Sequence, residues 1–94
     1  MEGIKLGYSI ANLAQKNGWG CGSYLLKDGS SVKVCSDSIT GITRLFQVKS
    51  GRLISGEAAR GNNDIAAMLD RYAQKAVNKD EAYMAFMNSF DMLM

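Results

Sequence analysis

Apolar and polar residues alternate on both sides of Lys27-Asp28-Gly29. The apolar residues at alternate positions are Tyr24, Leu26, Val32 and Val34. A period of two around a glycine-containing turn is typical of a β-hairpin. A two-residue Asp28-Gly29 turn would split these side chains between the two faces of the hairpin. A three-residue loop with a left-handed glycine collects all four on one face, and the sequence therefore predicts that register.

The same register places the two cysteines of the chain opposite each other. Cys21 would pair with Cys35 on the face away from the apolar residues, whereas a two-residue turn would send the two thiols to different faces. Directly opposed strand cysteines meet the Cβ separation of ~3.5–4.5 Å that a disulfide needs. We expect them to be adjacent free thiols in the reducing cytoplasm, and to oxidise readily in vitro with little change of fold.

A second hairpin is predicted around Lys49-Ser50-Gly51, between a strand over Thr43–Val48 and a strand over Arg52–Ser55. With a three-residue loop, the inner face would hold Phe46, Val48 and Ile54, and the other face would hold Leu45 and Leu53. Apolar residues then occupy both faces, so burial alone does not decide this register. Between the two hairpins, Ser36–Gly41 is polar and contains glycine, which favours a turn or a bulge.

Helical periodicity is confined to the two ends of the chain. A short helix is predicted over Ser9–Gly18, with Ser9 as its N-cap and Asn17-Gly18 as its end. Residues 4–8 fit a strand as well as an upstream extension of this helix, and both interpretations stay open.

Two further helices are predicted in the last third of the chain. The first begins at Asn62 or Asn63, ends at Asn78, and would bury Ile65, Met68, Leu69, Tyr72 and Ala76 on one face. The second starts near Lys79, and its apolar stripe comprises Tyr83, Phe86, Met87, Phe90 and Met94. The order helix, four strands, helix, helix predicts a single α+β domain over residues 1–94. Its antiparallel sheet of two hairpins would carry the C-terminal helices on one face.

The residue types that are absent exclude most catalytic chemistry. The chain has 94 residues, no histidine and two cysteines, so it lacks histidine-activated nucleophiles and the ligands of a four-cysteine zinc or iron–sulfur site. We expect no metal, no cofactor and no enzymatic activity, with a cysteine-based or Ser/Lys-based hydrolase as the alternative. Apolar stretches fall short of the ~20 residues that span a bilayer, and no secretory signal is visible. We therefore expect a cytoplasmic protein without membrane contact.

Basic residues concentrate in the predicted sheet. Residues 16–60 carry seven basic and three acidic side chains, whereas residues 61–94 carry three basic and five acidic ones. The basic residues of interest are Arg44, Lys49, Arg52 and Arg60. The first three are expected to cluster in one hairpin, where they could bind nucleic-acid phosphates while nearby aromatic rings stack on bases. Lysine and arginine also protect sheet edges against aggregation, and a net charge of +2 without a nucleic-acid motif favours this second interpretation.

Three alternating glycines surround a tryptophan and a cysteine in Gly18-Trp19-Gly20-Cys21-Gly22. Glycine permits a positive φ or the close approach of another backbone, but the spacing matches neither a Walker loop nor a dinucleotide-binding loop. We interpret the segment as a connector in which Trp19 fills part of the core. Residues 56–61 are likewise interpreted as a connection from strand to helix.

The final helix is rich in methionine and apolar over more than one stripe. Its methionines are Met84, Met87, Met92 and Met94. Two interpretations stay open: the helix is plain core, or a second face of it contacts a partner or a second copy of the chain.

A small α+β chain without catalytic residues is typical of the accessory proteins with which phages and mobile elements inhibit larger machines. We predict a non-catalytic regulator or inhibitor that occupies a surface of a protein partner, through Met84 and Met87 or through the basic hairpin tips. Mimicry of DNA is disfavoured because the chain is mildly basic. The alternative is a nucleic-acid-binding module that uses the four basic residues named above.

Overall fold

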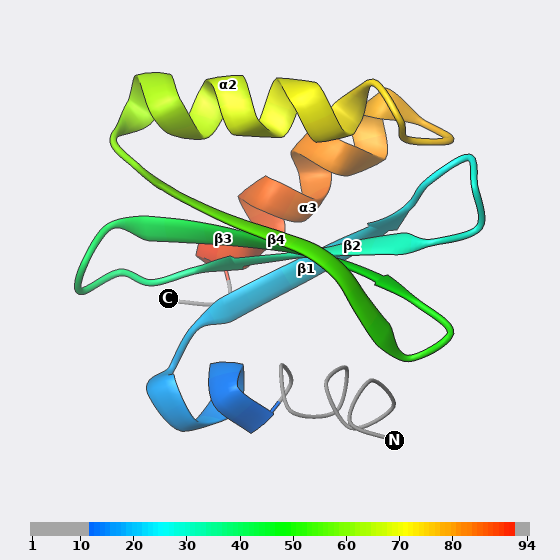
Figure 1. Cartoon of the computed structure of the whole chain (residues 1–94). Coiled ribbons are helices and arrows are strands. Elements are labelled where there is room, and N and C mark those ends of the chain that lie inside the picture. The colour runs from blue at the N-terminus through cyan, green and yellow to red at the C-terminus, as the bar shows by residue number, and fades with distance from the viewer. Residues whose placement is uncertain (1–11, 92–94) are drawn as a thin grey trace.

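The computed structural model describes residues 12–91 and has the α+β architecture that the sequence predicts (Figure 1). A helix over residues 12–17 comes first. The strands are β1 (Gly20–Leu25), β2 (Ser31–Ser36), β3 (Ile42–Lys49) and β4 (Arg52–Arg60), and the C-terminal helices are α2 (Asn62–Ala73) and α3 (Lys79–Asp91). Each strand pairs antiparallel with the next, in the sheet order β1-β2-β3-β4. The predicted N-cap Ser9, the open segment 4–8, Met92, Met94 and the side chain of Phe90 lie outside the described residues.

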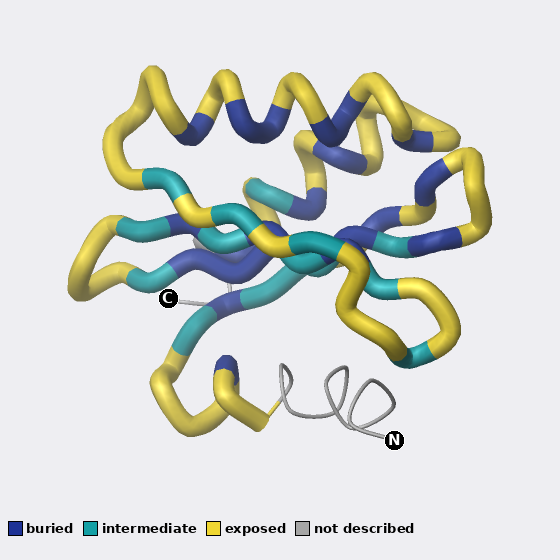
Figure 2. The backbone as a smooth tube through the Cα atoms, in the orientation of Figure 1, coloured by how far each residue is buried: buried dark blue, intermediate teal, exposed yellow. Residues whose placement is uncertain are grey.

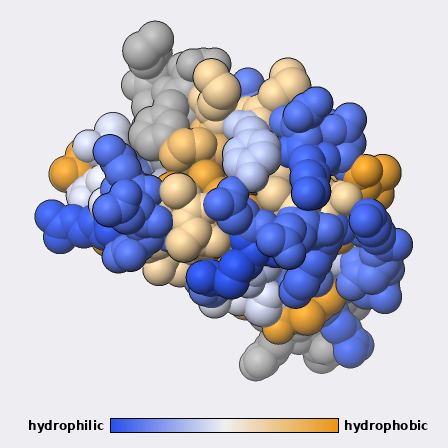
Figure 3. Space-filling model, turned by 90° about the horizontal axis from the view of Figure 1, so that it is seen from above, coloured by the Kyte–Doolittle hydropathy of each residue, from blue (hydrophilic) through white to orange (hydrophobic). Residues whose placement is uncertain are grey.

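The sheet lies between helices on its two sides. α2 and α3 cover one face, and the helix over residues 12–17 lies on the other side (Figure 1). The main core lies between the sheet and the two C-terminal helices, whose buried segments face the strands (Figure 2). Seen from above, hydrophilic side chains cover much of the surface, with apolar side chains between them (Figure 3).

The first hairpin has the predicted three-residue loop. Leu26 N–H donates to the Ser30 carbonyl at 2.8 Å, and Gly29 is left-handed with φ of 88°. Asp28 stabilises the loop because its carboxylate accepts hydrogen bonds from the side chain and the backbone N–H of Ser30, which lower the pKa of Asp28. All four alternate apolar residues are buried: Tyr24, Leu26, Val32 and Val34. The predicted register is confirmed.

The second hairpin differs from the prediction. Ser50 and Gly51 are both left-handed, with φ of 53° and 77°, and form a two-residue turn that pairs Lys49 with Arg52. A bulge then leaves Ile54 without a partner, because the strand pairs are Val48 with Leu53 and Gln47 with Ser55. The buried face consequently holds Thr43, Leu45 and Gln47, while Phe46 and Val48 are half-buried and Ile54 is 51% exposed.

β4 extends to Arg60, so residues 56–60 form a strand and not the connection that was expected. α2 buries the predicted face, with Ile65, Met68, Leu69 and Tyr72. Its N-cap is Gly61, without a side-chain hydrogen bond, and not an asparagine. The helix ends at Ala73, and buried Ala76 pairs with Leu26 as an isolated bridge.

Candidate interaction surface between α3 and the edge of β1

α3 packs directly against the backbone of β1. A β-carbon on Gly22 would lie 2.8 Å from the Ala85 Cα and would collide with the Ala85 carbonyl oxygen. Only glycine at this position allows such an approach. The residues of α3 that are buried here are small: Ala82, Ala85 and Ser89.

A hydroxyl cluster holds the second half of α3 on the sheet. Buried Ser36 shares hydrogen bonds with Thr43 at 3.2 Å and with Ser89 of α3 at 2.7 Å. The Ser89 hydroxyl also bonds to the Phe86 carbonyl. These contacts satisfy polar groups that would otherwise be buried without partners.

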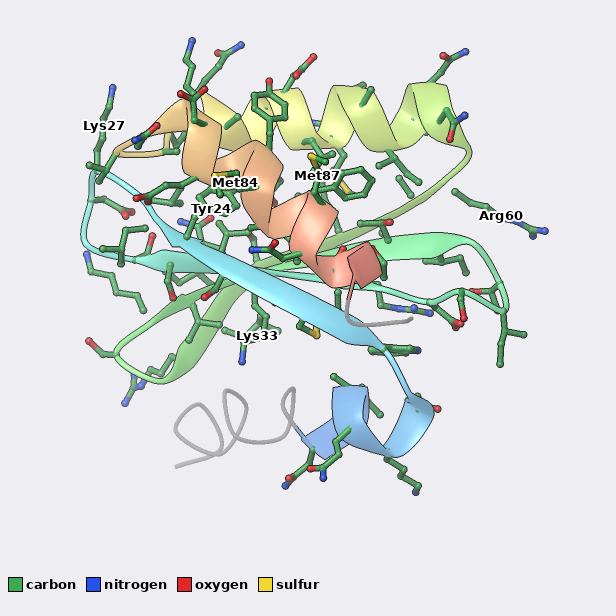
Figure 4. The ribbon with its side chains drawn as sticks, turned by 180° about the vertical axis from the view of Figure 1, so that it is seen from behind. Tyr24, Lys27, Lys33, Arg60, Met84 and Met87 are labelled. Carbon is green, nitrogen blue, oxygen red and sulfur yellow. A yellow bond between two sulfur atoms is a disulfide. The ribbon has the colours of Figure 1, made fainter. Side chains whose placement is uncertain are left out.

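Small residues form the closest contact with the sheet, and Tyr83, Met84 and Met87 point outward, whereas Phe86 packs against the core. This corrects the predicted buried stripe, since Tyr83 is exposed, Met84 is 59% exposed and Met87 is 63% exposed, while Phe86 is half-buried. We define Tyr83, Met84 and Met87 as the α3 patch; Figure 4 shows both methionines on α3. Tyr83 is held in place because its hydroxyl donates to Asp70 of α2 at 2.6 Å, and this bond raises the pKa of Tyr83.

A pocket of about 380 Å³ lies between the patch and the edge of β1. Its lining includes Ser23, Leu25, Ser31, Glu81, Met84 and Asn88. Leu25 is a further exposed apolar residue, so Leu25 and Met84 flank the pocket from two elements. Polar and apolar residues therefore contribute about equally to the lining of the pocket.

Tyr24 also lines this pocket and is almost fully buried. Within the described part of the chain, its hydroxyl has no hydrogen-bond partner. Burial, reinforced by Tyr72 and Tyr83, raises the pKa of Tyr24 to about 12. Tyr24 therefore stays neutral near pH 7 and cannot act there as a phenolate nucleophile.

The basic residues singled out from the sequence do not form one cluster. Lys49 and Arg52 are paired beside the turn of the second hairpin. Arg44 lies five residues before Lys49 on β3, so the two side chains point to opposite faces of the sheet. Arg60 is at the other end of β4, opposite Ile42.

Arg44 instead stacks over the ring of Trp19, 4.3 Å from its centroid. Trp19 is half-buried and lies outside the main core cluster, so the expectation that it fills the core was wrong. The neighbouring Asp37 carboxylate accepts the Ile39 N–H at 2.9 Å, and this bond is the main cause that lowers the pKa of Asp37.

Cys21 and Cys35 are paired across β1 and β2 in the predicted register. The structure joins them in a disulfide, with Cα atoms 4.2 Å apart, and so contains the oxidised form in place of the expected free thiols. Cys35 is buried, whereas Cys21 is half-buried. The redox state in the cell stays a prediction.

Among the described side chains, no group of three Cys, Asp or Glu residues is arranged to hold a metal ion. In the same part of the chain, no helix has the length and apolarity needed to cross a bilayer. Comparisons with protein-family models, curated proteins and solved structures found no match. The function proposed below therefore depends on the geometry of the structure alone.

Sequence reasoning missed the contact between Gly22 and α3. A signal for it exists, because Ala82, Ala85 and Ser89 follow one another at three and four residues, the spacing of one helix face. A stripe of small residues together with a glycine in an adjacent strand indicates close backbone packing.

Proposed function

We propose that this protein is a non-catalytic regulator that binds a protein partner through the α3 patch and acts by covering part of the partner's surface. One observation carries the proposal: the buried residues described in α3 are small, Phe86 packs half-buried against the core, and Tyr83, Met84 and Met87 are directed outward. Exposed apolar side chains gathered on one face of a helix, here beside a pocket that Met84 lines, are typical of interaction sites.

The composition of the patch supports a protein as the binding partner. Methionine and tyrosine are enriched at protein interfaces, and methionine adapts its shape to an irregular surface. The bond from Tyr83 to Asp70 fixes one of the three side chains before binding, which reduces the entropy lost in the complex. Inhibition by steric occupancy needs no catalytic group and suits the accessory proteins of phages and mobile elements.

The positions of the four predicted basic residues do not favour the nucleic-acid alternative. Arg44 stacks on an indole, and Lys49 with Arg52 forms only a local pair at a hairpin turn. Nucleic-acid binding stays a prediction that a titration with generic DNA and RNA at low salt would test.

The test is the double variant Met84→Asp with Met87→Asp. Its matched control is Ile39→Asp with Ile54→Asp, which places the same two charges at other exposed apolar residues. Partners captured by the wild-type protein from its native host and identified by mass spectrometry would supply the ligand for affinity measurements.

We expect both variants to keep the circular dichroism spectrum of the wild type. The methionine variant should lose at least about thirtyfold in affinity for the partner, the effect of one hot-spot residue, while the control retains it. Equal affinity of the two variants would contradict the proposal. Loss of fold in the methionine variant alone would show that these side chains are core. If the captured chain is a second copy, sedimentation would show a concentration-dependent dimer that the methionine variant abolishes.

A further inference from the structure

The two edges of the sheet, β1 and β4, differ in how they are protected against pairing with another chain. β4 contains Arg52, Glu57 and Arg60, and it has the bulge at Ile54. Charged side chains and bulges are the usual devices that prevent edge pairing. β1, with the sequence Gly-Cys-Gly-Ser-Tyr-Leu, has neither.

Hydrogen bonding in the first hairpin shows which backbone groups of β1 point away from β2. Leu26 N–H donates to the Ser30 carbonyl, so even-numbered residues pair with β2 through backbone hydrogen bonds. The separation of 4.2 Å between the Cα atoms of Cys21 and Cys35 is that of a pair without such bonds. Odd-numbered residues, including Ser23, therefore direct their N–H and C=O groups toward the outer edge.

The chain already adds a short strand to this edge. Lys27 N–H donates to the Lys75 carbonyl at 2.9 Å, and Val77 N–H donates to the Leu25 carbonyl at 3.1 Å, in an antiparallel bridge. The chain then turns into α3. No described residue pairs with the outward N–H and C=O of exposed Ser23, two positions further along the edge.

The pocket lies beside this unpaired stretch, since Ser23 of β1 and Met84 and Asn88 of α3 all line it. Seen from behind, β1 is the nearest strand and α3 lies above it (Figure 4). Side chains of a strand added here would alternate between the two faces of the sheet. Every second side chain would point toward α3.

We propose that the open edge of β1 at Ser23 receives an extended peptide segment of the partner protein, which adds to the sheet as an antiparallel strand. The segment places an apolar side chain in the pocket beside Met84. Its backbone supplies affinity through hydrogen bonds, and the pocket supplies selectivity. This inference rests on the protein-binding function proposed above and specifies how the partner binds.

The test compares Ser23→Pro with the matched control Ser23→Ala. Proline removes the outward N–H of Ser23 without removing a hydrogen bond to β2, a substitution that edge strands accept. Alanine changes the side chain and keeps the N–H. The probe is a displayed library of random nine-residue peptides, selected on the wild-type protein, and the selected peptides are then titrated into both variants.

We expect the selected peptides to bind the wild type and the alanine variant alike, and the proline variant at least about fivefold more weakly. In the wild-type protein, hydrogen exchange of the Ser23 amide should be fast when free and slowed when the peptide is bound. If the proline variant does not fold, the exchange measurement on the wild-type protein tests by itself whether the peptide binds at Ser23.

Equal binding to the proline variant, an unchanged exchange rate at Ser23, or a library without binders would each overturn the inference. Protection of the Ser23 amide by self-association at high concentration would assign the edge to a second copy and also overturn it. The proposed function is judged separately. Peptides that lose binding to the Met84/Met87 double variant but not to the proline variant would show that the α3 patch binds the peptide and that the edge of β1 does not.

Discussion

Replacing Gly22 by alanine should destabilise the protein strongly, because the new methyl group would meet the backbone of α3. Its carbon would lie 2.8 Å from the Ala85 Cα, whereas ordinary contact begins at 3.4 Å. The helix must therefore move by more than half an ångström, although the hydrogen bond between Ser36 and Ser89 holds it on the sheet. Overpacking of this kind costs about 1–3 kcal/mol, and a backbone obstacle places the cost near the upper end.

Alanine also gives the unfolded chain less conformational entropy than glycine does, and this effect stabilises the folded protein by about 0.5 kcal/mol. We therefore expect the free energy of unfolding to fall by roughly 2–3 kcal/mol. For a domain of this size the midpoint of thermal unfolding should fall by roughly 8–24 °C. Urea unfolding followed by circular dichroism, together with a thermal scan, measures both quantities.

Gly56→Ala is the matched control, because it makes the same change in a strand where the new methyl group has only ordinary contacts at 3.7 and 3.8 Å. It should change the free energy of unfolding by no more than about 0.5 kcal/mol. If the Gly22 and Gly56 variants are equally stable, the close packing of α3 on β1 is wrong.

Three further predictions concern groups outside this contact. Reducing the Cys21–Cys35 disulfide should lower the free energy of unfolding by up to about 3 kcal/mol without loss of the sheet, as judged by urea unfolding with and without a dithiol; an unchanged midpoint would contradict this. The pKa of Tyr24 is higher in the folded protein than in the unfolded chain, so between pH 10 and 12 the tyrosine ionises first in the unfolded chain. The free energy of unfolding should therefore keep its full value below pH 10 and fall as the pH rises toward 12. Tyr24→Phe should remove this loss and be neutral or stabilising at pH 7, and a large destabilisation would mean that the hydroxyl has a partner. Arg44→Ala should lower the free energy of unfolding by about 1 kcal/mol because the contact with the Trp19 ring is lost, whereas Lys49→Ala should lower it by less than about 0.5 kcal/mol. Equal decreases would argue against the stacking.

The two hairpins show how far alternation predicts a sheet. In the first, Tyr24 and Val32 belong to a single series of alternate apolar residues. Only one register buries all of these side chains, and that register fixes the length of the loop. In the second, Leu45 and Phe46 are both apolar and adjacent, and either face could be the buried one. A bulge at Ile54 and a left-handed serine resolved this ambiguity, and neither has a distinct sequence signal.

α3 shows the limit of assigning burial by side-chain size. Its large residues predicted a buried stripe through Tyr83 and Met87, yet the face that packs on β1 consists of small residues. The choice depends on Gly22, which is 63 residues away from Ala85 in the sequence. Helix periodicity describes one element and contains no information about the distance at which another backbone will lie.

Oxidative footprinting of the methionines measures whether the partner covers the α3 patch. In the free protein, Met84 and Met87 should oxidise rapidly and Met68, which is fully buried, slowly. In the complex with the captured partner, oxidation of Met84 and Met87 should slow at least about fivefold, while that of Met68 should not change. Unchanged oxidation of both exposed methionines in the complex would show that the partner binds elsewhere and would contradict the assignment of the α3 patch.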